Sequence, residues 1–267
     1  MCRTVDLHQA VLAKNDERAL ALRAELAARG TTAVNLLSSP GSGKTALLER
    51  LLERCAAEGL PTAAVTADLA TENDAERLAR SGAPVRQILT DGLCHLEAGM
   101  LRRHLTEGGW LPEDTAVLWV ENVGNLVCPA SYDLGETLRV VLASVTEGED
   151  KPLKYPTAFG LANAVVITKT DIAEAVEFDR EGFLSNLRQV NPEVPVLETS
   201  ARTGQGTAEL LEFVRRTRDG RSPVHRPALA AEHEPLLHHR HEDDDHSHGE
   251  GHRHDEGHPH PHEIPAV

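Results

Sequence analysis

The chain has 267 residues and a formal net charge of −15, with 42 acidic residues against 27 lysines and arginines. This acidic balance argues against a nucleic-acid partner, and no apolar run approaches the ~18 residues of a membrane span, so we expect neither nucleic acid nor membrane as a partner. The four cysteines form no CxxC pair and no dense disulfide framework, which favours a reducing cytoplasm.

Residues 1–30 are predicted to form an N-terminal helical arm. Apolar residues recur there at roughly helical spacing. Asn15 and Asp16 have the side chains of an N-cap, so we expect two short helices that meet at this point and end at Gly30.

Residues 31–218 are predicted to form one α/β domain. Amphipathic stretches alternate with short apolar or β-branched runs at residues 32–37, 61–67, 115–121, 138–146, 164–169 and 194–199. Because strands that alternate with helices are typical of βαβ units, we expect a mainly parallel central sheet flanked by helices.

Residues 38–45, SSPGSGKT, follow the first predicted strand and precede a predicted helix over residues 46–57. This context is typical of the Walker A loop of a P-loop nucleotidase, in which backbone NH groups bind phosphates. Lys44 would lie along the phosphates and the Thr45 hydroxyl would bind magnesium. Ser38 stands where the strict pattern has glycine, and the alternative is a glycine-rich turn that binds nothing. The predicted nucleotide-binding residues of this loop are Gly41, Ser42, Gly43, Lys44, Thr45 and Ala46.

Two further segments are predicted to respond to the nucleotide. Glu121 ends a buried run and Gly124 follows three residues later, so this segment is expected to bind magnesium or water and to sense the γ-phosphate. Asp68 opens a polar stretch over residues 68–74 that we interpret as a first switch whose acid reaches magnesium. The alternative for this stretch is a helix cap, which is compatible with the switch.

The base is predicted to be guanine. Residues 168–171, TKTD, are similar to the Asn-Lys-x-Asp motif, in which the carboxylate accepts two hydrogen bonds from guanine and the lysine stacks on the base. Lys169 and Asp171 would take these roles, and Ser200 with Ala201 is similar to the companion loop that contacts the guanine carbonyl. Thr168 stands where asparagine is usual, and by itself the segment could be a plain strand-to-helix cap.

Cys94, His95 and Cys128 are a candidate transition-metal site. Thiolate and imidazole suit nickel, zinc or cobalt better than magnesium, and three protein ligands leave a coordination position open for transfer. The alternatives are a structural zinc site and ordinary buried cysteines beside a surface histidine. We assign Cys55, on the apolar side of the helix after the phosphate loop, to the core.

The ordered motifs resemble those of the HypB family, the nickel-incorporation GTPases of hydrogenase maturation. The similarity rests on LSSPGSGKT at 37–45, TENDAER at 71–77, CHLEA at 94–98, ENVGNLVCPA at 121–130, DLGE at 133–136 and SVTEGEDKPLKYP at 144–156. Some family members also have an N-terminal Cys-x-x-Cys-Gly-Cys nickel site, and here only Cys2 lies near that end.

This resemblance implies a homodimer promoted by GTP, with nickel or zinc bound by Cys94, His95 and Cys128 near the subunit interface. It implies hydrolysis of GTP to GDP and phosphate during nickel delivery to the large subunit of nickel-iron hydrogenase. The implied partners are this large subunit and other hydrogenase accessory proteins. A lysine within residues 151–154 would complete the partner's nucleotide site.

Residues 219–267 are predicted to be a disordered tail rich in His, Asp and Glu. Eleven histidines fall between His233 and His262, and neutral imidazoles in such a segment can hold nickel without a preformed fold. Family members usually have such stretches near the N-terminus. Two other functions stay open at this point, namely a urease accessory GTPase and a nickel storage or buffering protein.

Overall fold

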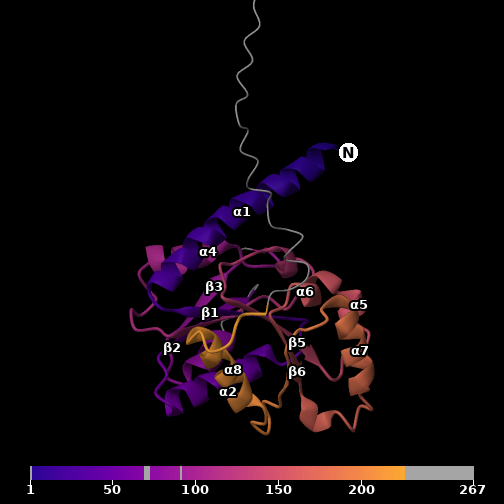
Figure 1. The fold of residues 1–267 in the computed structure, drawn as a ribbon. Coiled ribbons are helices and arrows are strands. Elements are labelled where there is room, and N and C mark those ends of the chain that lie inside the picture. Colours follow the sequence, from indigo (N-terminus) through magenta and orange to yellow (C-terminus); the bar gives the residue numbers. More distant parts are fainter. Residues whose placement is uncertain (1, 69–72, 91, 226–267) are drawn as a thin grey trace, which may run out of the picture. The chain divides into compact units, whose positions relative to one another are not determined.

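A parallel seven-stranded sheet lies at the centre of the protein in the computed structural model, which describes residues 2–68, 73–90 and 92–225 (Figure 1). The strand order is β3-β2-β4-β1-β5-β6-β7, and every pairing is parallel. The strands are β1 Thr32–Ser38, β2 Thr62–Asp68, β3 Val85–Leu89, β4 Val117–Glu121, β5 Leu138–Ser144, β6 Ala164–Thr168 and β7 Val196–Glu198. All residues of β1, β4, β5 and β6 are buried, because helices cover both faces of a parallel sheet.

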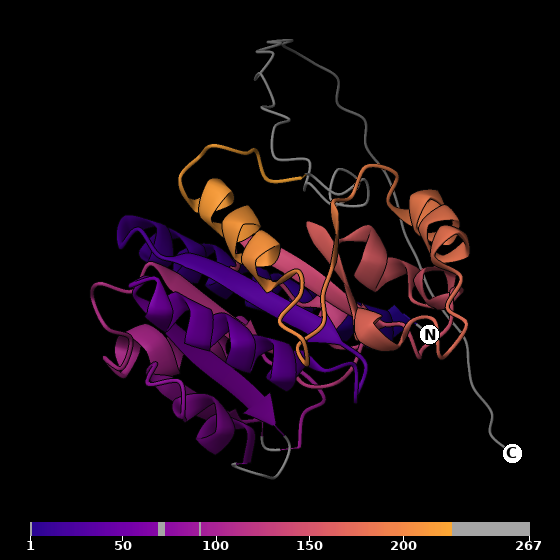
Figure 2. The ribbon, with the colours of Figure 1, turned by 90° about the horizontal axis from the view of Figure 1, so that it is seen from below.

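One face of the sheet is covered by α2 (Lys44–Ala57), α3 (Asn73–Ala79) and α8 (Thr207–Arg218). Figure 2 shows α8 and α2 side by side across this face. Leucines of α2 and α8 pack there against Trp119, Leu138 and their strand neighbours. This apolar contact holds α2, and with it the loop that precedes α2, at the carboxyl end of β1.

The opposite face carries two apolar clusters. In the first, α1 (Cys2–Ala28) and α4 (Ala98–Arg102) with its π-helical extension Arg103–Glu107 pack on β1, β2 and β4. In the second, α6 (Pro156–Gly160) and α7 (Arg180–Val190) pack on β5 and β6. Three short helices complete the described elements: Pro129–Ser131, α5 Lys151–Lys154 and Thr170–Ile172.

The predicted fold class, a P-loop α/β fold with a parallel sheet flanked by helices, is confirmed, and all six predicted strands are present. The strand β3, which lies at the edge of the sheet beside β2, was not predicted. Four of its five residues are only partly buried or exposed, and Arg86 and Gln87 interrupt its apolar pattern. An edge strand of this kind lacks the continuous apolar run that marks a central strand.

The prediction of two short N-terminal helices was wrong, because α1 is one helix from Cys2 to Ala28. Asn15 lies inside this helix and caps nothing in it. Instead its buried side chain accepts a hydrogen bond from Ala98 N at 3.0 Å and donates one to Asp133 O at 2.8 Å. The Asn15 side chain, which suggested the start of a helix, therefore bonds to residues distant in the sequence instead.

Among the described residues, no helix has the length and apolar character needed to cross a membrane. After α8 the chain runs to His225, whose Nε2 lies 2.8 Å from Asn191 Oδ1 and whose carbonyl accepts a hydrogen bond from Asn163 at 2.9 Å. Of the predicted histidine-rich tail, residues 219–267, the structure describes only residues 219–225, and residues 226–267 lie outside the described part of the chain.

Candidate nucleotide and metal site

The phosphate loop connects β1 to α2 and has the conformation that its glycines permit. Gly41 and Gly43 have φ values of 73° and 91°, in the left-handed region that favours glycine. Lys44 is buried, and its Nζ donates a 2.9 Å hydrogen bond to Ser38 Oγ. Ser38, the departure from the strict motif, thus supplies an acceptor for the lysine. Burial lowers the pKa of Lys44, against the opposing effect of Glu121 and other acids.

A cavity of about 310 Å³ lies beside this loop. Gly43, Lys44, Thr45 and Ala46 line it on one side, and residues 121–124 line it on the other. The Thr45 hydroxyl donates a 2.7 Å hydrogen bond to Glu121 Oε1. A Cβ at Gly124 would lie only 3.2 Å from Pro40 Cα, so glycine allows the predicted sensor to approach the phosphate loop closely.

The first switch is described only in part. Asp68 is the last residue of β2, but its side chain and residues 69–72 lie outside the described residues. The structure adds two side chains from α3 to the cavity, Asp74 and Arg77. Arg77 Nε and Nη2 both donate hydrogen bonds to Glu49 Oε2, at 2.9 and 2.7 Å. Arg77 was not among the predicted site residues, although its spacing of three from Asp74 places both on one side of a helix.

The predicted base loop lies beside the phosphate loop. Lys169 has φ 59°, and its Cε would lie 3.8 Å from a Cβ built on Gly43. Asp171 Oδ1 accepts a 2.6 Å hydrogen bond from Ser200 Oγ, which lowers the pKa of Asp171 and keeps the carboxylate ionised. The carbonyl of Ala201 accepts a hydrogen bond from Arg50. The residues that were predicted to bind the base, from the two separate segments, therefore lie next to each other.

Glu147 is a further contact that sequence reasoning missed. Its Oε1 accepts a 2.5 Å hydrogen bond from Ser42 Oγ, and its Oε2 lies 2.8 Å from Lys151 Nζ. Lys151 is buried, and its ion pair with Glu147 lies within its own chain. Lys154, the other lysine of the predicted trans-acting stretch, is 61% exposed and pairs with Asp150 at the surface. The spacing of four between Glu147 and Lys151 was the available signal for their pairing.

The structure brings Cys94, His95 and Cys128 together. Cys94 and His95 precede α4, whereas Cys128 ends the loop that follows β4. One potential ligand atom from each residue lies within 4.8 Å of the others, and Cys94 Sγ lies 3.7 Å from His95 Nδ1. The His95 ring stacks on Tyr132 with centroids 3.8 Å apart. Two segments more than thirty residues apart thus present three soft donors to one point.

The electrostatics of this cluster fit a divalent cation. A hydrogen bond with Cys128 raises the pKa of the Cys94 thiol, and burial and repulsion from a Cys128 thiolate raise it further. Burial lowers the pKa of His95, which keeps the imidazole neutral. His95 Nε2 is buried and has no hydrogen-bond partner within the described residues. A cation bound by the three residues would relieve the repulsion between the thiolates.

Together, the fold and the site define a P-loop nucleotide-binding protein with a cluster of three residues that could bind a soft metal ion. The family model for the CobW/HypB/UreG nucleotide-binding domain matches residues 32–198. The chain belongs to this family and, within it, to the HypB hydrogenase maturation factors.

Three comparisons support this assignment. The hydrogenase maturation factor HypB of Azotobacter chroococcum is 42% identical over 88% of this chain and 76% of its own length. The hydrogenase/urease maturation factor HypB of Helicobacter hepaticus is 39% identical over 81% of this chain and 89% of its own. A crystal structure of HypB from Helicobacter pylori in complex with nickel matches with a TM-score of 0.73 and 38% identity, covering 79% of this chain and 99% of that one.

Proposed function

We propose that this protein is a GTP-hydrolysing nickel metallochaperone that delivers nickel during maturation of nickel-iron hydrogenase. The observation that carries the proposal is the position of Cys128. It lies four residues after Gly124, in the loop that follows β4, and the same loop lines the nucleotide cavity. A loop that responds to the γ-phosphate would therefore also move a nickel ligand.

The residues around the cavity fit a magnesium nucleotide. Lys44 would neutralise charge on the β- and γ-phosphates, and the backbone NH groups from Gly41 to Ala46 would bind them. Thr45, with Asp68 or Glu121, would hold magnesium, which when bound supplies further charge neutralisation on the phosphates. Gly124 would contact the γ-phosphate, as predicted for the sensor.

Guanine selectivity would come from Asp171. Its carboxylate is ionised and held by Ser200, so it can accept two hydrogen bonds from the base. Adenine offers no such pair of donors. Lys169 would stack on the base, with Ser200 and Ala201 completing the loop that contacts the guanine carbonyl.

Nickel is the cargo we propose for Cys94, His95 and Cys128, with zinc as the alternative ion. The support is the donor set and the crystal structure of the Helicobacter pylori relative in complex with nickel. Leu93 and Val127, next in sequence to Cys94 and Cys128, are 39% and 64% exposed. This apolar rim fits a surface that a second copy or a nickel-accepting protein covers.

The proposed partners are a second copy of this chain, bound in the GTP state, and the large subunit of nickel-iron hydrogenase with its other accessory proteins. Lys154 is the better candidate for a lysine that acts across a dimer, because Lys151 is buried against Glu147. We place the protein in the cytoplasm, where thiol ligands stay reduced.

Nickel titration in two nucleotide states tests the proposal. A chain that ends at His225 removes the tail histidines, so that the measured binding reports on the described domain. We expect one nickel ion per chain, with affinities that differ by about five- to 150-fold between GDP and a non-hydrolysable GTP analogue. The Cys94→Ala variant should lose this binding while retaining GDP. Equal affinities in the two states would refute the coupling.

A urease accessory role is a second candidate because the Helicobacter hepaticus relative is named a hydrogenase/urease maturation factor. Complementation of bacterial strains that lack either the hydrogenase or the urease nickel-insertion GTPase separates the two. Restoration of urease alone would overturn the hydrogenase assignment. For a storage protein, deletion of residues 226–267 should abolish all activity, whereas a maturation factor should keep hydrogenase maturation.

A further inference from the structure

A row of buried polar side chains separates the two apolar clusters on the α1 side of the sheet. Its members are Asn35, Asn122, Glu136 and Arg139, which are all at most 9% exposed. They lie on β1, at the end of β4, before β5 and in β5. Polar groups at such positions are stable only when each finds a hydrogen-bond partner, so their partners show what the row connects.

Asn122 stands between the sensor and the metal ligands. Its side-chain oxygen accepts a 2.9 Å hydrogen bond from Val123 N, the peptide immediately before Gly124. The same oxygen accepts a 3.3 Å hydrogen bond from Leu96 N, the residue immediately after His95. The backbone of Asn122 donates to the Leu36 carbonyl of β1 at 3.2 Å. One oxygen thus joins the sensor loop to the Cys94–His95 segment, with the sheet as a fixed support.

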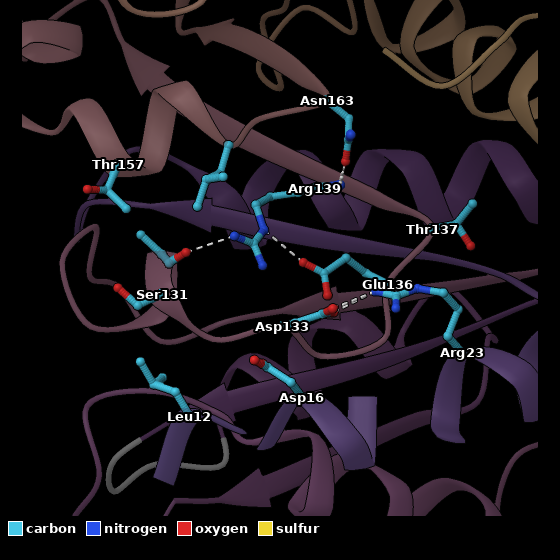
Figure 3. A pocket seen from close by; sticks show the side chains of 12 residues that line it. Leu12, Asp16, Arg23, Ser131, Asp133, Glu136, Thr137, Arg139, Thr157 and Asn163 are labelled. Atoms are coloured by element: carbon cyan, nitrogen blue, oxygen red, sulfur yellow. Dashed lines mark hydrogen bonds and ion pairs between the residues drawn. The ribbon is translucent and has the colours of Figure 1, made fainter. Parts of the chain in front are cut away.

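The amide nitrogen of Asn122 begins a series of hydrogen bonds that reaches the residues just after Cys128. Its nitrogen donates to Asn35 at 3.4 Å, and Asn35 donates to Glu136 at 3.3 Å. Glu136 accepts a 2.8 Å bond from Arg139. Figure 3 shows Arg139 between Glu136 and the chain around Ser131. The guanidinium donates to the carbonyls of Ala130 and Tyr132, and Tyr132 stacks on His95.

We propose that Asn122 is a positioning residue that transmits the state of the γ-phosphate sensor to the Cys94–His95 segment. The inference rests on the proposed function. It adds a second route by which the nucleotide state reaches the metal ligands. A shift of residues 123–124 toward a γ-phosphate displaces Cys128 along its own loop, and through the shared Asn122 oxygen it also displaces Leu96 and the neighbouring ligands. Both halves of the trio then respond to the nucleotide.

Asn15 offers a matched control for Asn122. It is a buried asparagine whose side chain also accepts a hydrogen bond from the ligand-bearing segment, at Ala98 N. Its other hydrogen bond goes to Asp133 O, so within the described residues its side chain supports the segment after His95 and has no hydrogen bond to residues 121–124. Loss of Asn15 should loosen the metal site equally in both nucleotide states, whereas loss of Asn122 should reduce the difference between the states to the part that the Cys128 route supplies.

The experiment measures nickel dissociation constants with GDP and with a non-hydrolysable GTP analogue, in chains ending at His225. The ratio of the two constants is the readout, and the thiolate-to-nickel absorption band confirms that the same ligands bind. We expect the native ratio of about five- to 150-fold to fall by more than about twofold in Asn122→Ala, with the Cys128 route supplying the ratio that remains. Asn15→Ala should keep the native ratio within about twofold while both constants shift together.

The outcomes separate this inference from the function on which it rests. Equal affinities in the native chain overturn the proposed function and this inference with it. A native ratio that persists in Asn122→Ala overturns the inference alone. If the ratio falls by the same factor in Asn15→Ala, the inference is also overturned, because a general loosening of the metal site then explains the effect. Should Asn122→Ala not fold, Asn122→Ser removes the reach to Leu96 with less change in polarity and is read in the same way.

Discussion

The Thr168 hydroxyl donates a 2.7 Å hydrogen bond to the carbonyl of Ser42, and this contact fastens the base loop to the phosphate loop. Both residues are buried. Threonine replaces the asparagine of the usual motif, yet its short side chain still connects the loop after β6 to the loop after β1. The side chains that we propose for the base are therefore positioned relative to those for the phosphates.

The Asp171→Asn substitution tests the choice of base. An amide presents a donor where the carboxylate presents only acceptors, so guanine loses a charged hydrogen bond, while the additional carbonyl of xanthine becomes an acceptor for the new donor. We expect GDP affinity to fall on the order of 100-fold, since bonds to charged groups contribute ~1.5 to 3 kcal/mol each, and xanthosine diphosphate to bind better than GDP. Fluorescence titration with labelled GDP and XDP measures both. Unchanged GDP affinity would contradict the assignment.

Arg77 is expected to contribute to hydrolysis more than to nucleotide binding. It lines the cavity beside Lys44 and is held there by Glu49. Because an arginine near the γ-phosphate stabilises the charge of phosphoryl transfer, Arg77→Ala should lower kcat for GTP by about tenfold or more, with GDP affinity changed much less. Phosphate release under saturating GTP is the measurement. Arg80, which is exposed and three residues later, provides the control, and an equal loss in Arg80→Ala would contradict a specific role.

Thiol reactivity should distinguish the core cysteine from the two metal ligands. Burial raises the pKa of Cys55 to about 11, so at pH 8 only about 0.1% of this thiol is ionised. In a Cys2→Ser chain we expect two thiols to react quickly without nickel and none to react quickly with nickel. Mass spectrometry after brief alkylation counts them, with magnesium in place of nickel as the control. Nickel that protects neither Cys94 nor Cys128 would exclude both as ligands.

His225 should make stability depend on pH. Burial lowers its pKa in the folded chain below the ordinary value of 6.5, so the unfolded chain binds more protons in that range. The contribution of His225 is therefore complete above about pH 6.5 and decreases as the pH falls below it. The Tm of the native chain should drop more between pH 7.5 and 5.5 than that of His225→Gln, which keeps a donor for Asn191. Parallel melting curves for the two chains would contradict this expectation.

The sequence determined the features whose chemistry is local in the chain. The phosphate loop is eight consecutive residues, and glycine conformation, lysine charge and the threonine hydroxyl all follow from neighbours in sequence. Strand and helix periodicity likewise showed the α/β order, because burial against one sheet imposes a repeat on each element. The ligand types of Cys94, His95 and Cys128 indicated a soft metal before any contact was known.

Only the tertiary structure decided the contacts between distant segments. Asn15 resembled a helix cap, yet it lies inside α1 and bonds to Asp133, 118 residues away. The shared oxygen of Asn122 and the contact of Glu147 with Ser42 have no signature in periodicity or spacing. A hydrogen bond depends on the position of two atoms, and for residues far apart in the chain that position is set by how the helices pack on the sheet.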